Sequence, residues 1–129
     1  MKIINMKNYK DLEIYRKSFD LAILIHKLSL KLPTYEQFEL ASQIRRSAQS
    51  TRSNIVEGYG RREYKPEFIR FLIFSQSSCD ETISHLDMLI KIYPLILEDR
   101  NLNEEYEILC KMINNFIKYV RNNWKTGKS

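Results

Sequence analysis

The segment SNIVEGYGRRE, residues 53–63, decides between two very different folds. It holds two of the chain's three glycines, Gly58 and Gly60, and the pair Arg61-Arg62 follows at once. Glycine beside positive charge is typical of a phosphate-binding loop, which follows a β-strand and ends in Lys-Ser or Lys-Thr. Here a helical pattern precedes the glycines, and that ending does not follow them. The segment is therefore interpreted as a helix end, with Gly60 as a left-handed C-cap and Gly58 as a point of close helix packing.

The composition favours a few long helices over many short strands. The chain has 129 residues, of which 43% are hydrophobic and 29% charged, which suits a single soluble domain spanning residues 1–129. Its 3 glycines and 3 prolines leave few places for turns. No run of about 18 apolar residues suggests a membrane span, and the first residues show no secretory apolar core. Cys79 and Cys110 have no CxxC partner, so we expect buried free thiols in the cytoplasm rather than a disulfide.

Hydrophobic periodicity outward from the opening segment predicts four helices. They span about residues 11–31, 36–59, 66–92 and 102–125. Asp11 suits the N-cap of the first helix, Pro33 ends it, and Pro66 suits the first turn of the third. Because the connections are short, we expect neighbouring helices to be antiparallel. The sequence thus predicts an all-α protein, an up-down-up-down four-helix bundle.

The first helix carries apolar residues on two nearly opposite faces. One face contains Leu12, Tyr15, Phe19, Ala22 and His26. Since a bundle helix in a monomer needs only one apolar stripe, the second indicates a partner chain. We assign the opposite face to the interface of a closed homo-oligomer, together with apolar residues outside the core stripe of the third helix. The predicted interface residues are Ile14, Leu21, Ile25, Leu28, Ile69, Ile73 and Phe74.

Charge is segregated along a chain whose formal net charge is +5. Residues 45–70 hold seven basic and three acidic side chains, whereas residues 80–107 hold eight acidic and two basic ones. A basic surface attracts phosphate, although solvated faces of a mildly basic protein explain the pattern as well. The predicted nucleic-acid contacts are Arg45, Arg46, Arg52, Arg61, Arg62, Lys65 and Arg70.

Residues at the end of the second helix have a structural and a functional interpretation. Arg61, Arg62 and Lys65 complement the negative end of a helix dipole just as they would attract phosphate. Tyr59 and Tyr64 lie beside them and suit either base stacking or packing in a core or interface.

Metal chemistry finds little support in the sequence. A di-iron bundle uses Glu-x-x-His motifs, and neither His26 nor His85 follows a glutamate by three residues. Glu81 precedes His85 by four, which fits an exposed helical pair. We expect no metal and no cofactor.

Catalysis finds no better support. Ser50, Ser53 and Cys79 have no evident base with an orienting partner. Glu57 fits an ion pair or hydrogen bond at a helix or subunit junction better than a lone general base. We therefore expect the protein not to be an enzyme.

Three segments together resemble a bacterial four-helix-bundle family, the proteins encoded by 23S ribosomal RNA intervening sequences. They are YKDLEIYRKSFDLA at 9–22, SQIRRSAQSTRSNIVEGYGR at 42–61 and KPEFIRFLIFSQSSCDE at 65–81. The resemblance covers about residues 9–92 and extends to the accessory variability determinant of diversity-generating retroelements. It implies an antiparallel bundle that assembles as a homopentamer with a positively charged surface for nucleic acid. Arg52 departs from the pattern, because many relatives have proline there.

We therefore expect a non-catalytic nucleic-acid-binding oligomer that binds RNA, or else DNA, mainly through phosphate contacts. The expected surface comprises the second helix, the following loop and the start of the third helix. The alternative is a protein-interaction scaffold whose basic surface docks an acidic protein, with contacts from the acidic segment 80–107 as well. The sequence suggests neither a membrane nor a small-molecule substrate as a partner.

Overall fold

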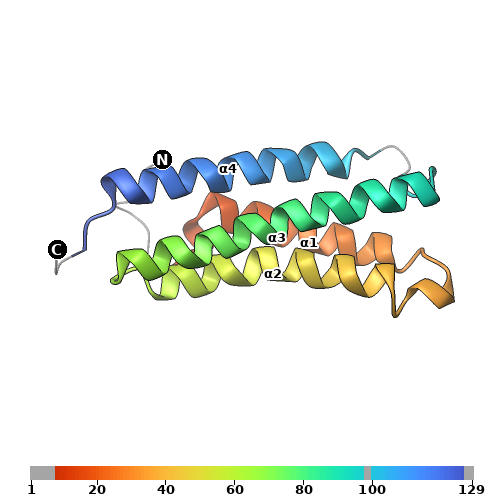
Figure 1. Cartoon of the computed structure of the whole chain (residues 1–129), viewed down its shortest axis with the longest axis horizontal. Helices are drawn as coiled ribbons and strands as arrows, with labels where there is room; N and C mark the ends of the chain where they lie inside the picture. Colours follow the sequence, from red (N-terminus) through yellow and green to blue (C-terminus); the bar gives the residue numbers. More distant parts are fainter. Residues whose placement is uncertain (1–7, 98–99, 127–129) are drawn as a thin grey trace.

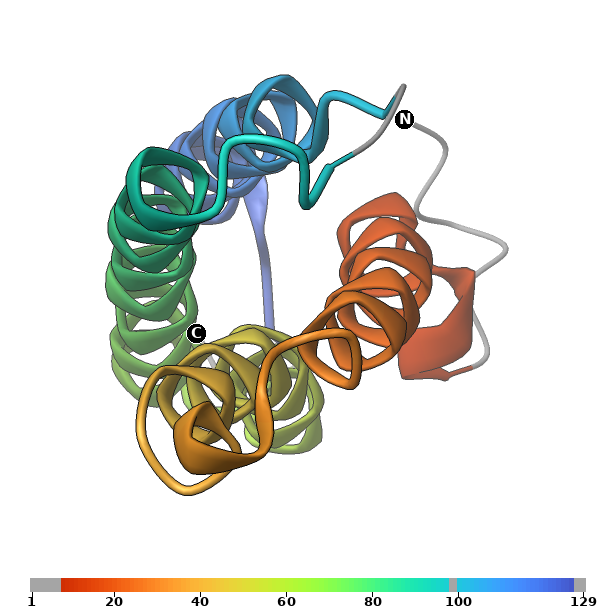
Figure 2. The ribbon, with the colours of Figure 1, turned by 90° about the vertical axis from the view of Figure 1, so that its right-hand side faces the viewer.

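The computed structural model describes residues 8–97 and 100–126. Its α-helices are α1 (Glu13–Ser29), α2 (Leu40–Gly60), α3 (Lys65–Ile92) and α4 (Leu102–Asn123), and the short 3-10 helices are η1 (Tyr9–Asp11) and η2 (Thr34–Glu36). The described residues contain four α-helices and no β-strand, which confirms the all-α prediction. The helices share one long axis and follow one another around a common centre (Figures 1 and 2). None of these helices combines the length and apolar character needed to cross a membrane.

The helix ends differ from the predicted ones where local hydrogen bonds form tighter turns. At the start, the Asn8 Oδ1 atom accepts from the Lys10 N–H at 2.8 Å, and Asp11 Oδ2 accepts from the Asn8 N–H at 3.2 Å. This reciprocal pair caps η1, whereas the N-cap of α1 is Leu12, so the predicted Asp11 cap is wrong and α1 begins at Glu13. Likewise η2 occupies the predicted start of the second helix, which delays α2 to Leu40.

The two glycines of the opening segment have different roles. Gly60 is the last residue of α2 and is not left-handed, so the predicted glycine cap is wrong. Arg61 leaves the helix instead, with φ −107° and ψ 18°. At Gly58 the packing prediction is confirmed, because a Cβ there would lie 3.2 Å from Phe71 Cβ and 3.3 Å from the Phe68 carbonyl oxygen.

Buried stripes of all four helices form the core. One stripe of α4 is buried along the whole helix: Leu102, Tyr106, Leu109, Ile113, Phe116 and Val120. Both cysteines are free, as predicted, although Cys110 is only half-buried while Cys79 is completely buried. Other fully buried side chains are Ile25, Ile44, Ile55, Phe68, Leu72, Leu86, Tyr106, Leu109 and Ile113.

The two apolar faces of α1 exist, but their assignment needs correction. Ile14, Leu21, Ile25 and Leu28 are 1%, 2%, 0% and 5% exposed. They belong to this chain's own core and offer no surface to a partner chain. On the opposite face Leu12, Tyr15 and Ala22 are also buried, whereas Phe19 at 42% and the neighbouring Ile23 at 40% are exposed. Helical periodicity identifies two stripes, but only the packing of α1 on its neighbours shows which positions of each stripe are internal.

Small hydroxyl side chains line the contact between α2 and α3. The Ser75 hydroxyl donates to the Thr51 carbonyl oxygen at 2.6 Å, and the Thr82 hydroxyl donates to Ser47 Oγ at 2.9 Å. Because these side chains are short and their hydrogen bonds are satisfied, the two helix backbones approach closely without buried unpaired polar groups. We call this set the hydroxyl seam: Ser47, Ser50, Thr51, Ser75, Ser78 and Thr82.

Candidate nucleic-acid interface

The seven basic residues predicted to contact nucleic acid do not form one continuous charged surface. The structure places them in three environments, which differ in what the cation contacts. The first holds Arg45, Arg62 and Lys65, the second Arg61 and Arg70, and the third Arg46 and Arg52.

Arg45 joins the end of α1, the following connection and α2. Its Nη1 atom donates to Ser29 Oγ at 2.8 Å and to Gln37 Oε1 at 3.2 Å, and its Nη2 atom donates to the Gln37 carbonyl oxygen at 3.0 Å. Gln37 in turn donates from Nε2 to the Ser29 carbonyl oxygen at 2.9 Å. The half-buried guanidinium therefore stabilises the α1–α2 connection through these hydrogen bonds and is not available to bind a phosphate.

Arg62 and Lys65 bind carbonyl oxygens at helix ends. Arg62 Nη1 donates to the Tyr59 carbonyl oxygen at 3.0 Å, and its guanidinium carbon lies 4.2 Å from the centre of the Tyr59 ring. Lys65 Nζ donates to the Arg121 carbonyl oxygen in the last turn of α4 at 2.7 Å. Both cations satisfy backbone acceptors at the negative end of a helix, as the structural interpretation of this run expected.

Arg61 and Arg70 lie on the rings of the half-buried Phe71 and the exposed Phe74. The Arg61 guanidinium carbon is 4.8 Å from the centre of the Phe71 ring, and that of Arg70 is 5.2 Å from the centre of the Phe74 ring. Glu67 contacts both arginines, at 3.8 Å from Arg61 Nη1 and 3.0 Å from Arg70 Nη1. The stacked guanidiniums are thus partly neutralised.

Glu57 completes this group. Its Oε2 atom lies 3.7 Å from Arg61 Nε, one helical turn away, which confirms the ion-pair interpretation of this residue. Two arginines and two glutamates carry no net formal charge, so this surface is less attractive to phosphate than the sequence suggested. We call these residues the arginine–aromatic cluster: Glu57, Arg61, Glu67, Arg70, Phe71 and Phe74.

Arg52 and Arg46 lie on different sides of α2, because six residues place two side chains about 120° apart around a helix axis. Arg52 is half-buried, and its Nε and Nη2 atoms donate to Gln49 Oε1 at 3.0 and 2.7 Å. Arg46 is exposed. Among the residues that the structure describes, no carboxylate lies within ion-pair distance of either arginine.

A groove between α1 and α2 runs beside Arg52. Its volume is about 350 Å³, and Lys27 from α1 adds a second cation that is also unpaired within the described residues. We call it the α1–α2 groove, lined by Phe19, Ala22, Ile23, His26, Lys27, Gln49 and Arg52. Sequence reasoning missed Lys27, because it lies outside the basic segment and meets Arg52 only through the packing of α1 on α2.

Of the three groups considered as nucleophiles, Cys79 and Ser50 take part in contacts between helices, whereas Ser53 is exposed and bonds only within α2. Cys79 is completely buried and its thiol donates to the Tyr106 carbonyl oxygen at 3.5 Å. A hydrogen bond with Cys110 and burial raise the pKa of Cys79, so its thiol stays protonated at neutral pH. Ser50 shares a hydrogen bond of 2.8 Å with Ser78 in the hydroxyl seam.

Titratable side chains do not gather into a ligand set. Glu81 Oε1 lies 3.7 Å from His85 Nε2, which confirms the expected helical pair. Within residues 8–97 and 100–126, no three His, Cys, Asp or Glu side chains are placed to hold one metal ion. Glu98 and Asp99, part of the predicted acidic segment, lie outside the described residues.

Exposed apolar residues are more numerous than the sequence predicted. Of the predicted interface residues on α3, Ile69 is half-buried, whereas Ile73 and Phe74 are exposed. At the end of the bundle that holds the α1–α2 connection, Phe38 is 90% exposed. Its segment had been assigned to the start of the second helix, so a loop position for this ring was not expected. Other exposed large apolar residues are Leu30, Tyr35, Met88, Ile92, Leu95 and Ile108.

The fold and these surfaces define a class of protein: a small four-helix protein with arginines and aromatic rings on its outer faces. More specifically, residues 10–115 match the family described as 23S rRNA-intervening sequence protein, and the chain belongs to that family. The match confirms the resemblance in the first three helices and extends it into α4. A comparison with curated proteins finds no match.

Proposed function

We propose that this protein is a non-catalytic nucleic-acid-binding protein with RNA as its ligand, acting in the cytoplasm as a closed homo-oligomer. The observation that carries the proposal is the positive charge of Arg52 and Lys27 in the α1–α2 groove, which no carboxylate of the described residues pairs; Arg46, elsewhere on α2, has none within those residues either. A cation that no carboxylate neutralises displaces counterions from a nucleic acid when it binds a phosphate. The release of these counterions drives nucleic-acid binding. We therefore centre the interface on the α1–α2 groove instead of the α2–α3 loop.

Three features of the α1–α2 groove favour a nucleic acid over a free anion. Gln49 holds the Arg52 guanidinium through two hydrogen bonds, which fixes a donor fork suited to phosphate. Phe19 offers an exposed ring beside it, and ring faces stack with bases. Repetition of the groove by symmetry in an oligomer would multiply the phosphate contacts of each chain.

The assembly is the second part of the proposal. The hydroxyl seam supports an antiparallel bundle, because Ser47 meets Thr82 whereas Thr51 meets Ser75. For the subunit contact we propose the outer face of α3, with Ile73 and Phe74, and the outer stripe of α1. Five subunits, and a kinship with the accessory variability determinant of retroelements, remain expectations from the resemblance in residues 9–81. Native mass spectrometry measures the subunit number.

The binding experiment is fluorescence anisotropy with a labelled RNA hairpin and a matched DNA duplex over a range of salt. We expect binding that weakens steeply with salt and is tighter for RNA. The double substitution K27A/R52A, which removes both cations of the groove, is expected to reduce affinity about tenfold or more and to lower the salt slope by about two. Absence of binding to either ligand at low salt would contradict the proposal.

A matched control separates local from overall charge. The double substitution K111A/K118A removes the same charge from exposed positions on α4, away from the groove. We expect a much smaller loss of affinity for it. Equal losses in the two variants would mean that binding does not use the groove. Light scattering on each variant checks that assembly is unchanged.

The arginine–aromatic cluster favours a second candidate, a protein-interaction scaffold. Arginine and exposed aromatic rings are enriched at protein interfaces, and the cluster has little net charge to offer a phosphate. If this function is the main one, a captured protein partner will compete with RNA or bind where RNA does not. Substitution R70A will then weaken the protein complex and leave RNA binding unchanged.

A further inference from the structure

The two cysteines of the chain meet in the contact between α3 and α4, which lie side by side in Figures 1 and 2. Cys79 lies on α3, and its thiol donates to the Tyr106 carbonyl oxygen of α4 at 3.5 Å. Cys110 follows Tyr106 by four residues, so its N–H faces the same carbonyl oxygen within the helix. The Cys79 thiol therefore lies against the turn of α4 that carries Cys110.

The two side chains also interact directly. A hydrogen bond with Cys110 is the largest influence that raises the pKa of the Cys79 thiol, ahead of burial. Tyr106 lies beside both thiols, because they add to the effect of burial on the pKa of its phenol. A disulfide forms without backbone movement only between cysteines that are already close in space. This pair meets that requirement while both thiols are free.

The two thiols differ in their access to solvent. Cys79 is completely buried, whereas Cys110 is half-buried. Since the thiolate is the reactive form of cysteine, the buried and protonated Cys79 is a poor first nucleophile. An oxidant that arrives from solution therefore meets Cys110 first, and Cys79 is the neighbouring thiol that can react with the product.

We propose that Cys79 and Cys110 form a reversible disulfide between α3 and α4 when the protein meets a hydroperoxide. The Cys110 thiolate first attacks one peroxide oxygen and becomes a sulfenic acid, while the other oxygen leaves as water or an alcohol with the thiol proton. The Cys79 sulfur then attacks the Cys110 sulfur, and the hydroxyl group leaves as water with the Cys79 proton. Two thiols thus give two electrons to the peroxide, and a cytoplasmic thiol such as glutathione returns them by exchange.

The disulfide would add a covalent link where the bundle has none. The hydroxyl seam joins α2 to α3, and a bond from Cys79 to Cys110 extends this fixed unit to α4. It closes a loop in the unfolded chain, which favours the folded state. The inference goes beyond nucleic-acid binding and does not depend on it, because neither thiol lines the α1–α2 groove.

Mass spectrometry of the intact protein tests the disulfide. The reduced protein is treated with a small excess of hydrogen peroxide, and the remaining thiols are alkylated with iodoacetamide. We expect the chain to lose the mass of two hydrogen atoms and to take up no alkyl group. Trypsin should then release fragment 71–91 bound to fragment 101–111, and dithiothreitol should separate them.

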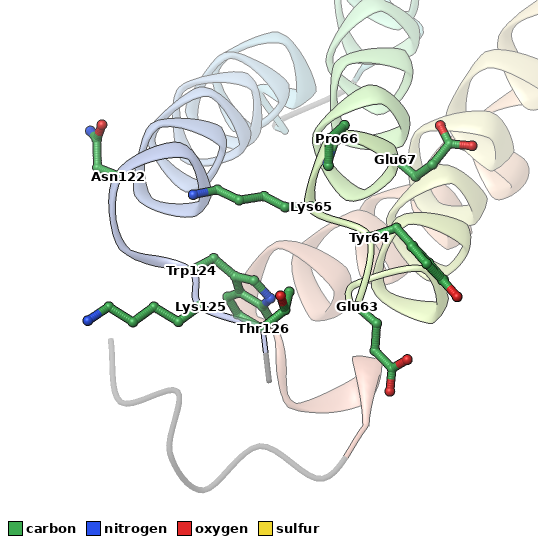
Figure 3. A pocket seen from close by; sticks show the side chains of 9 residues that line it. All are labelled: Glu63, Tyr64, Lys65, Pro66, Glu67, Asn122, Trp124, Lys125 and Thr126. Carbon is green, nitrogen blue, oxygen red and sulfur yellow. The ribbon is translucent and has the colours of Figure 1, made fainter. Parts of the chain in front are cut away.

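Trp124 reports whether the bond strengthens the packing of α4. It is the single tryptophan, and its indole donates to the Arg62 carbonyl oxygen at 3.2 Å. Figure 3 shows it after the end of α4, where it lines a pocket of about 860 Å³ next to the α2–α3 connection. Loss of this contact on heating changes the indole emission. We expect the oxidised protein to melt about 5 °C or more above the reduced protein.

Single substitutions separate the two roles. In Cys79→Ala the sulfenic acid of Cys110 has no partner, so dimedone, which labels sulfenic acids, should label the chain after peroxide treatment. In Cys110→Ala the remaining thiol is buried and should take up no label. Circular dichroism checks that each variant is folded, and the experiment on the unsubstituted chain stands without them.

Three results would overturn the assignment. Sulfinic acid at Cys110 without the linked fragments would show that Cys79 does not reach it. A bond from Cys110 of one chain to Cys110 of another would place the disulfide between copies. An oxidised protein that melts below the reduced one would show that the bond forms only by distorting the contact between α3 and α4.

Discussion

Tyr106 carries the most unfavourably placed polar group in the described core. The side chain is completely buried, and within the described residues its hydroxyl has no hydrogen-bond partner. Burial raises the pKa of this phenol, and the nearby Cys79 and Cys110 thiols raise it further, so the hydroxyl stays neutral. A buried donor that lost its water and gained no partner lowers stability.

Tyr106→Phe is therefore expected to raise the free energy of unfolding by about 1 kcal/mol, because it removes only the unpaired hydroxyl. Urea denaturation followed by circular dichroism measures the change. Tyr93→Phe is the control, since the Tyr93 hydroxyl donates to Glu36 Oε2 at 2.8 Å and its removal should not stabilise the protein. A loss of stability in Tyr106→Phe would mean that its hydroxyl does have a partner in solution.

Two adjacent arginines of α2 differ in what they contribute to stability. Arg45→Ala removes three hydrogen bonds from a charged donor and should lower the free energy of unfolding by about 2 kcal/mol. Arg46→Ala, at an exposed position, should change it by less than about 0.5 kcal/mol. Thermal and urea unfolding of the pair compare them directly. Similar values for both would show that Arg45 does not hold the α1–α2 connection.

At the scale of elements, the end of α2 shows how two nearby glycines can have opposite sensitivities. A methyl group at Gly58 would press against Phe71 Cβ at 3.2 Å and a backbone oxygen of Phe68 at 3.3 Å, so these neighbours would have to shift slightly. A methyl group at Gly60 would meet nothing within 4 Å. The reason is that Gly58 faces α3 whereas Gly60 does not.

Gly58→Ala is expected to destabilise the protein by about 1 kcal/mol, because a steric cost of about 1–3 kcal/mol exceeds the gain in helix propensity. Gly60→Ala should stabilise it by about 0.5 kcal/mol, since alanine restricts the unfolded chain. Melting temperatures of the two variants against the unchanged protein give the signs. If both substitutions stabilise, α2 and α3 are less closely packed at Gly58 than described.

Much of the element structure follows from the sequence alone. Apolar periodicity and prolines place four helices, because these signals are local. Three features depend on contacts distant in sequence and could not be predicted. Which positions of α1 are internal depends on the neighbours that cover them. The hydrogen bonds of Arg45 depend on the position of Gln37, and the α1–α2 groove forms only because the packing of the two helices places Lys27 and Arg52 in its lining. The basic residues that the sequence assigns to one surface therefore lie in three environments.

For the whole molecule, the exposed apolar residues are the surfaces available to the oligomer that we propose. Ile73 and Phe74 on α3 and Phe19 on α1 are partly exposed on different sides of the bundle. Contact between two unlike surfaces generates a ring when its rotation closes. Such contacts fit the closed oligomer that we propose.

Phe74→Glu should prevent assembly, since it places an unpaired charge in the proposed subunit contact. Size-exclusion chromatography with light scattering is expected to show the mass fall towards the 15.5 kDa of one chain. Phe74→Tyr retains the aromatic ring and should assemble normally. An unchanged mass for the glutamate variant would place the subunit contact elsewhere, with the exposed end around Phe38 as the next surface to test.

The hydroxyl seam has a consequence for how a protein of this kind can evolve. Its hydrogen bonds, together with the close approach at Gly58, fix α2 against α3 from the inside. Arg46 on the outer side of α2 takes no part in that contact. Substitutions at such outer positions leave the bundle intact, so a lineage can exchange one ligand for another while the helical frame stays the same.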